Sequence, residues 1–234
     1  MSRGRSALFV PDEVVLYYGE SLVNTLMFAL LIAAAESAAQ EKLKETPYYP
    51  LQVGTIWHYR SGESKFTIGV ARHEKVGDTL CALLETKREG KVVGSEHLAV
   101  AADGVYRHDL TSPQLRSDTN DKAKSAKILV YQTLKPPILV LKLPPKSGDS
   151  WKVDSKGDGT IFRGGFQAAQ QDVTVPAGTY KKAFRVASQD LEVNSLKPTI
   201  TTYFAEGVGM VKQVIEMGDA KIEIELEKFE AGGK

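Results

Sequence analysis

From residue 47 onward, apolar and polar side chains alternate with a period of two, and residues typical of tight turns interrupt the pattern. Phe66, Ile68 and Val70 fall on one face of such a segment, and Ile222, Ile224 and Leu226 alternate with glutamates within 221–229. This alternation is typical of half-buried strands, because successive side chains of a strand point to opposite faces. No segment beyond residue 47 shows a sustained helical period. The sequence therefore predicts an all-β protein.

The turns divide the pattern into short antiparallel strands. Asp-Gly pairs are strong hairpin signals, because the favoured two-residue turn needs positive φ at its central positions. The turns that we predict are Glu89–Lys91, Asp103–Gly104, Pro176–Thr179 and Gly218–Asp219. We expect an antiparallel sandwich or a strongly curved half-barrel, built from two meander halves and preceded by an apolar helical segment at the N-terminus.

Two regions in the middle of the chain break this rhythm. Residues 111–127 mix acids, bases and a proline, which predicts an exposed loop. An apolar run, 138–141, lies between two Pro-Pro pairs and predicts an edge strand or a covering segment. We place the seam between the two halves here.

Both tryptophans stand in the same short context, with a proline and a glycine at fixed distances before the indole. The residues are Pro50, Gly54 and Trp57 and, at a constant offset of 94, Pro144, Gly148 and Trp151. The repetition predicts two related halves, 47–135 and 136–230, within one β domain over 47–230. We expect the two indoles to cover the two ends of one core.

The N-terminal region carries the signature of export. The apolar run 22–35 is followed by small residues at Ser37 and Ala39, in the spacing that a signal peptidase accepts. We expect a signal peptide over 1–39, a linker over 40–46, and a periplasmic or secreted protein. The alternatives are an uncleaved membrane anchor and a buried helix of a cytosolic protein. Acidic residues before the apolar run are unusual in a signal peptide, and a start codon assigned too early would explain them.

Charge and cysteine content exclude other classes. The 30 basic and 29 acidic residues give a net charge of +1 and are spread along the chain, so we expect no nucleic-acid partner. The single Cys81 allows no internal disulfide and lies far from the position of a lipid-bearing cysteine. We interpret it as a small core residue.

No motif predicts catalysis, a metal site or a cofactor. Ser95 and His97 share a strand face, which we interpret as polar residues on a solvated surface. The four histidines lack a local spacing that would bring them together, and the Asp-rich turn 154–159 fails as a calcium loop at its third and twelfth positions. We therefore expect a protein that is not an enzyme.

A glycan-directed hydrolase remains a weaker alternative, because such enzymes need only two carboxylates in a cleft. The candidate carboxylates are Glu63, Glu85, Glu96, Asp172, Asp190, Glu192 and Glu206. Any β protein with many surface acids offers such pairs, so the signal is unspecific.

The leading hypothesis is a curved sheet that holds an apolar small molecule or a partner segment. It predicts an apolar cleft lined by Trp57, Phe66, Phe162 and Phe166. The main alternative is a cell-envelope scaffold or interaction module that binds an envelope protein through its sheet edges. In either case, we expect membrane contact only through an uncleaved N-terminal segment.

Four phrases of the sequence resemble a known group. The segments 49–57, 143–151, 173–180 and 203–209 together look like exported bacterial β proteins of unknown function, similar to DUF3108-type domains and more remotely to the half-barrels of periplasmic lipoprotein carriers. The resemblance implies a β fold and an exported location. Its motifs are structural turns, so it carries over no catalytic residue.

Overall fold

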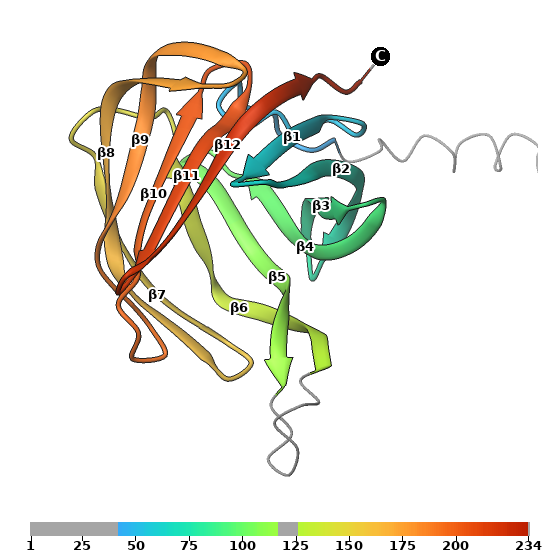
Figure 1. Ribbon diagram of the computed structural model, residues 1–234, viewed down its shortest axis with the longest axis vertical. Coiled ribbons are helices and arrows are strands. Elements are labelled where there is room, and N and C mark those ends of the chain that lie inside the picture. The colour runs from blue at the N-terminus through green and yellow to red at the C-terminus, as the bar shows by residue number, and fades with distance from the viewer. Residues whose placement is uncertain (1–41, 117–125, 234) are drawn as a thin grey trace, which may run out of the picture. The chain divides into compact units, whose positions relative to one another are not determined.

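The computed structural model describes residues 42–116 and 126–233, which form a closed antiparallel barrel (Figure 1). Each strand pairs with the next along the chain, and the last strand returns to the first. The strands are β1 (Ile56–Ser61), β2 (Ser64–Val76), β3 (Thr79–Arg88), β4 (Lys91–Val100), β5 (Gly104–Arg116), β6 (Ala126–Lys142), β7 (Ser150–Gly157), β8 (Thr160–Val175), β9 (Gly178–Val193), β10 (Thr199–Ala205), β11 (Gly209–Met217) and β12 (Ala220–Glu230).

The all-β prediction is confirmed, whereas the sandwich and the half-barrel are both wrong. The difference is the pairing of β1 with β12, which runs from Ile56 opposite Glu230 to Arg60 opposite Glu225. Two side-chain contacts of 2.8 Å join the same strands: a hydrogen bond between His58 and Glu230, and an ion pair between Arg60 and Glu225. Closure removes the two free edges that a half-barrel would expose. The alternation of apolar and polar residues predicts where the strands lie. It does not predict whether the first and last strands pair with each other.

The inward face of each strand supplies the core. Trp57 and Tyr59 alternate with His58 and Arg60 on β1, and Leu84, Leu98 and Val105 of β3 to β5 belong to the same buried cluster. A segment before the barrel adds to this core. Its members Leu43, Tyr49 and Leu51 are buried, so part of the expected linker packs against the barrel.

The two tryptophans lie at the same end of the barrel, so the expectation that they cover opposite ends is wrong. Trp57 is the second residue of β1 and Trp151 the second residue of β7. In an antiparallel barrel, all odd-numbered strands start at one end. Gly54 and Gly148 precede them with φ of 86° and 91°, a left-handed conformation that favours glycine. The relation between the two halves stays a prediction.

The pairing between β6 and β7 is the weakest in the barrel. Within the described residues, a single pair, Lys135 opposite Lys156, is in register. Pro136 and Pro137 follow at once and have no N–H to donate, which interrupts the ladder. Side chains of β7 replace the missing bonds. Ser155 Oγ donates to the carbonyl of Pro136 at 2.6 Å, and Trp151 Nε1 donates to that of Leu139 at 2.9 Å.

The predicted loop over 111–127 is wrong at both ends, because β5 continues to Arg116 and β6 begins at Ala126. Residues 117–125 lie outside the described part of the chain. The apolar run 138–141 belongs to β6 and pairs along β5. Its other side faces β7 without a ladder, but the barrel is closed here, so the run is neither the edge strand nor the covering segment that was expected. The expected helical segment and the signal peptide lie within residues 1–41, which the described part does not include.

Candidate functional site

A partly enclosed cavity lies inside the barrel, behind the junction of β6 and β7. Its volume is about 120 Å³. Side chains from β5 to β11 line it, most of them apolar, among them Leu110, Ile138, Val153, Phe162, Phe166 and Phe204. Apolar cavities that are closed on most sides are the usual form of small-molecule sites.

Strand geometry places the two phenylalanines of β8 on the cavity wall. Phe162 and Phe166 are four residues apart, so both point to the inner face of the strand. The ring of Phe166 packs against Trp151, with centroids 5.8 Å apart. Across the weak junction, Ile138 of β6 and Val153 of β7 complete this side of the wall.

One charged residue lines the cavity among the described residues. Arg107 of β5 points inward, and its Nε donates to Glu96 Oε2 of β4 at 2.5 Å. About 32% of the Arg107 side chain is accessible, and it faces the cavity. Burial lowers the pKa of Arg107, but the Glu96 carboxylate and Tyr49 outweigh this effect and raise it overall. The cavity therefore contains a charged guanidinium that is already balanced by a carboxylate.

Tyr49 closes the cavity from the segment before β1. Its ring packs against Trp57 and Phe204, both at a centroid distance of 5.8 Å, and only 6% of the residue is exposed. Burial raises the pKa of the Tyr49 hydroxyl, and the negative charge of Glu96 raises it further. The hydroxyl thus stays protonated at all physiological pH values and can donate a hydrogen bond.

Two further polar side chains on the cavity wall form a hydrogen bond with each other. Gln213 Nε2 of β11 donates to Thr202 Oγ1 of β10 at 3.1 Å. No aspartate or glutamate lines the cavity in the described part of the chain. Of the seven carboxylates considered for glycan hydrolysis, Glu96 reaches this region, and it does so through its ion pair with Arg107.

The structure separates the four aromatic residues that were expected to line one cleft. Phe162 and Phe166 line the cavity. Phe66 lines a different, more open hollow at the other end of the barrel, together with Ile222 and Ile224. Trp57 lines neither hollow. It is buried in the core with 1% exposed, and its Nε1 donates to the carbonyl of Val208 at 2.6 Å.

Tyr49 and Arg107 were not among the predicted site residues. A signal for Arg107 exists, because Val105 and Arg107 are two residues apart on one strand and Val105 faces the core. An arginine at an inward position is rare enough to mark a polar site inside the barrel. Tyr49 gives no comparable signal, because it lies in a segment without strand periodicity.

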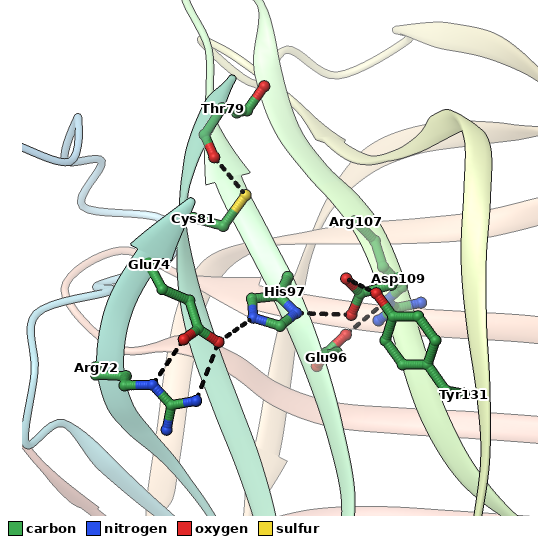
Figure 2. A network of polar contacts seen from close by, with 9 residues as sticks. All are labelled: Arg72, Glu74, Thr79, Cys81, Glu96, His97, Arg107, Asp109 and Tyr131. Atoms are coloured by element: carbon green, nitrogen blue, oxygen red, sulfur yellow. Dashed lines mark hydrogen bonds and ion pairs between the residues drawn. The ribbon is translucent and has the colours of Figure 1, made fainter. Parts of the chain in front are cut away.

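A polar network lies on the opposite face of β2 to β5, outside the core (Figure 2). His97 Nδ1 contacts Asp109 Oδ1 at 2.8 Å and its Nε2 contacts Glu74 Oε1 at 2.7 Å. Arg72 binds the same Glu74, and Tyr131 Oη donates to Asp109 Oδ2 at 3.0 Å. The His97 side chain is 13% exposed, so the expected solvated position of this histidine is wrong.

This network holds a charged histidine. Ionised carboxylates only accept hydrogen bonds, so both ring nitrogens of His97 must carry protons to donate to them. The hydrogen bond to Asp109 raises the pKa of His97, against burial, which lowers it, and the bond to Glu74 raises it again. A ring with both nitrogens engaged has no free position from which to accept a substrate proton.

Other chemistry finds no support near this network. Burial raises the pKa of the Cys81 thiol to about 11, and its Sγ contacts the carbonyl of Thr79 at 3.5 Å. Such a thiol is a poor nucleophile at neutral pH. Within residues 42–116 and 126–233, no three His, Cys, Asp or Glu side chains form a group that could hold a metal ion. The same ranges contain no helix of the length and apolarity that a membrane crossing requires.

Comparisons with known proteins give no family. No protein-family model and no curated protein matches the chain, so the resemblance to DUF3108-type domains is not confirmed. Two solved structures are similar. A "putative exported protein with YmcC-like fold" from Bacteroides fragilis is 13% identical over 78% of this chain and 98% of its own, with a TM-score of 0.47. A "putative lipoprotein" from Parabacteroides distasonis is 14% identical over 81% and 100%, with a TM-score of 0.39. Both likenesses are too weak to transfer a role to this chain.

Proposed function

We propose that this protein is a non-enzymatic binding protein that holds a small apolar molecule inside its barrel. The observation that carries the proposal is the cavity behind β6 and β7, with walls formed by Phe162, Phe166 and aliphatic side chains. An apolar cavity of about 150 Å³ is known to hold a benzene ring. The present cavity, at about 120 Å³, is of the size of a six-carbon ring or a short chain.

The test is a titration of the full chain with toluene, followed by thermal unfolding and by the NMR signals of methyl groups on the cavity wall. Binding to the folded state alone raises the melting temperature. Val140→Phe fills the cavity from β6, and we expect it to abolish this rise. Val92→Phe adds the same ring at an exposed position on β4 and serves as the matched control. The proposal fails if toluene leaves the wild-type protein unchanged, or if Val140→Phe binds toluene as well as the control does.

A location outside the cytoplasm is part of the proposal. It is supported by the apolar run 22–35 and by the small residues Ser37 and Ala39. Mass spectrometry of the protein from its own cell envelope tests it. We expect a mature N-terminus at Gln40, and an intact residue 1 on a cytoplasmic protein would contradict it.

A second candidate function is docking to an envelope protein, and one observation favours it. Of the seven large apolar side chains that are exposed in the described part of the chain, five lie at or near the end of the barrel opposite the tryptophans. They are Val92, Ile161, Leu196, Met217 and Ile222. Native mass spectrometry of the envelope-derived protein separates the candidates, because a bound small molecule and a bound protein differ in mass by orders of magnitude.

A further inference from the structure

The polar end of the cavity restricts what its ligand can be. Tyr49 and Arg107 both line the cavity, and Glu96 binds Arg107 from behind. Burial and the influence of Glu96 keep the Tyr49 hydroxyl protonated. No hydrogen bond of this hydroxyl falls within the described residues, and no fully buried side-chain polar atom among them lacks a partner, so the hydroxyl oxygen keeps some exposure where Tyr49 lines the cavity. Such a hydroxyl is free to donate, and a ligand atom that accepts a hydrogen bond would satisfy it once the ligand has displaced water from the cavity.

Charge balance decides the kind of acceptor. Arg107 is the one charged residue on the wall in the described part of the chain, and its ion pair with Glu96 is neutral as a unit. A carboxylate ligand would bring an uncompensated negative charge into an apolar cavity and would lie close to Glu96. A cationic ligand would lie close to the positive charge of Arg107, and the cavity wall offers it no free carboxylate. Burial of an unpaired charge costs far more than burial of a hydrogen-bonded neutral group.

We infer that the ligand is a neutral molecule with a six-carbon apolar body and one acceptor oxygen, such as an amide, ester or ketone, which binds the Tyr49 hydroxyl and the guanidinium of Arg107. The inference rests on the proposed function and names the class of molecule that the same cavity takes. The apolar body lies against Phe162 and Phe166, while the oxygen lies toward β4 and β5. Gln213 and Thr202, which are hydrogen-bonded to each other, are uncharged and do not alter the net charge of the cavity wall.

Three probes of equal ring size test the inference on the full chain at pH 7: benzamide, benzoate and toluene. We expect benzamide to bind at least tenfold more tightly than benzoate, because only the anion carries an unbalanced charge into the cavity. We expect toluene to bind more weakly than benzamide, since it leaves the Tyr49 hydroxyl without an acceptor. Isothermal titration calorimetry, with NMR for the weak complexes, gives the three dissociation constants.

Tyr49→Phe is the matched variant, because it keeps the ring contacts with Trp57 and Phe204 and removes only the hydroxyl. We expect it to weaken benzamide about five- to tenfold, which corresponds to one lost hydrogen bond, and to leave toluene unchanged. Benzoate binding that equals or exceeds that of benzamide would overturn the inference. So would equal affinities for benzamide and toluene, or a Tyr49→Phe protein that binds benzamide as before. If none of the three probes binds, the proposed function falls as well, and the two failures are thereby distinguished.

Discussion

At the junction of β1 and β12, five residue pairs are in register, and one hydrogen bond and one ion pair between side chains cross between the strands. At the junction of β6 and β7, which joins the same two sets of six strands on the other side of the barrel, one pair is in register and side chains make the other bonds. The difference follows from Pro136 and Pro137, which cannot donate to a ladder. One barrel can thus be closed by its backbone at one junction and by its side chains at another.

The cavity lies against the junction that side chains hold. Ile138 of β6 and Val153 of β7 face each other there and both line it. A wall without a continuous ladder opens at a lower free-energy cost than a wall with one. This junction is where the proposed ligand would need the least opening of the barrel to enter.

The largest expected effect concerns the tryptophan at each junction. Trp57→Ala removes a fully buried indole beside β12, and we expect a loss of about 3–5 kcal/mol in the free energy of unfolding. Trp151→Ala removes a partly buried indole beside β6, and we expect about half of that loss. Urea denaturation of both variants measures the difference. Trp57→Phe provides a milder substitution if Trp57→Ala does not fold, and equal losses at the two tryptophans would refute the contrast.

The next effect concerns a single bond of the β6–β7 junction. Ser155→Ala leaves the carbonyl of Pro136 without its buried donor, and we expect a loss of about 1–3 kcal/mol. Hydrogen exchange should become faster in β7 than in β1. Thr174→Ala removes an exposed hydroxyl from β8 and should change stability by less than about 0.5 kcal/mol. A Ser155→Ala protein as stable as this control would show that the junction does not depend on the side-chain bond.

A pH titration around neutrality should affect the half of the barrel formed by β1 to β6 and not the half formed by β7 to β12. All four histidines lie in β1 to β5, and the His97 network ties β2, β4 and β5 together. The folded-state pKa of His97 is raised above 6.5, so its contribution is complete below pH 6.5 and is lost as the pH rises through the raised value. Hydrogen bonds from Arg72 and then from His97 lower the pKa of Glu74, so its contribution is present above pH 4.5 and is lost as the pH falls.

We therefore expect the network to stabilise the barrel most between pH 4.5 and 6.5, with a loss of about 1 kcal/mol at higher pH, because a neutral imidazole can donate to only one of the two carboxylates. Melting temperatures of the wild type and of His97→Gln between pH 5 and 9 measure this loss, because glutamine does not titrate. Parallel curves for the two proteins would rule out the network as the source. Protection factors in β7, which are exchange rates relative to those of an unfolded chain at the same pH, should not follow this pH dependence.

The smallest effect concerns the one registered pair of the weak junction. Lys135 and Lys156 are directly opposite each other and both are exposed, so their like charges repel. Lys156→Glu should raise the free energy of unfolding by about 0.5 kcal/mol at low salt, and less at high salt. Lys152→Glu, also exposed on β7, changes the net charge equally and serves as the control. A gain that is the same for both variants would assign the effect to net charge instead of the pair.

Local pattern in the sequence predicts most of the strands but not their closure. Phe66, Ile68 and Val70 mark β2 correctly, and the turns at Gly90 and Gly218 fall where the structure places them. The contact between β1 and β12 depends on residues far apart in the sequence, such as His58 and Glu230, which are 172 positions apart. The alternation of apolar and polar residues within β1 or within β12 does not identify the other strand as its partner.

The candidate site was predictable only for the residues that follow this same pattern. Phe162 and Phe166 lie four residues apart on the inner face of β8 and were expected as ligand contacts. Trp57 has the same apolar character, but its indole fills the core and finds its hydrogen-bond partner at Val208, 151 positions away. Tyr49 approaches the cavity from outside the sheet, so strand periodicity carries no information about it.

The return of β12 to β1 also sets the order in which the molecule can be completed. A nascent chain that has emerged only as far as Met217 presents β1 and β11 as two unsatisfied edges, and such edges recruit other chains. The barrel has no unpaired edge strands only after its final eleven-residue strand, β12, has been synthesised and has paired with β1 and β11. Premature termination before Ala220 should consequently harm the cell through association of the truncated product as well as through loss of the intact protein.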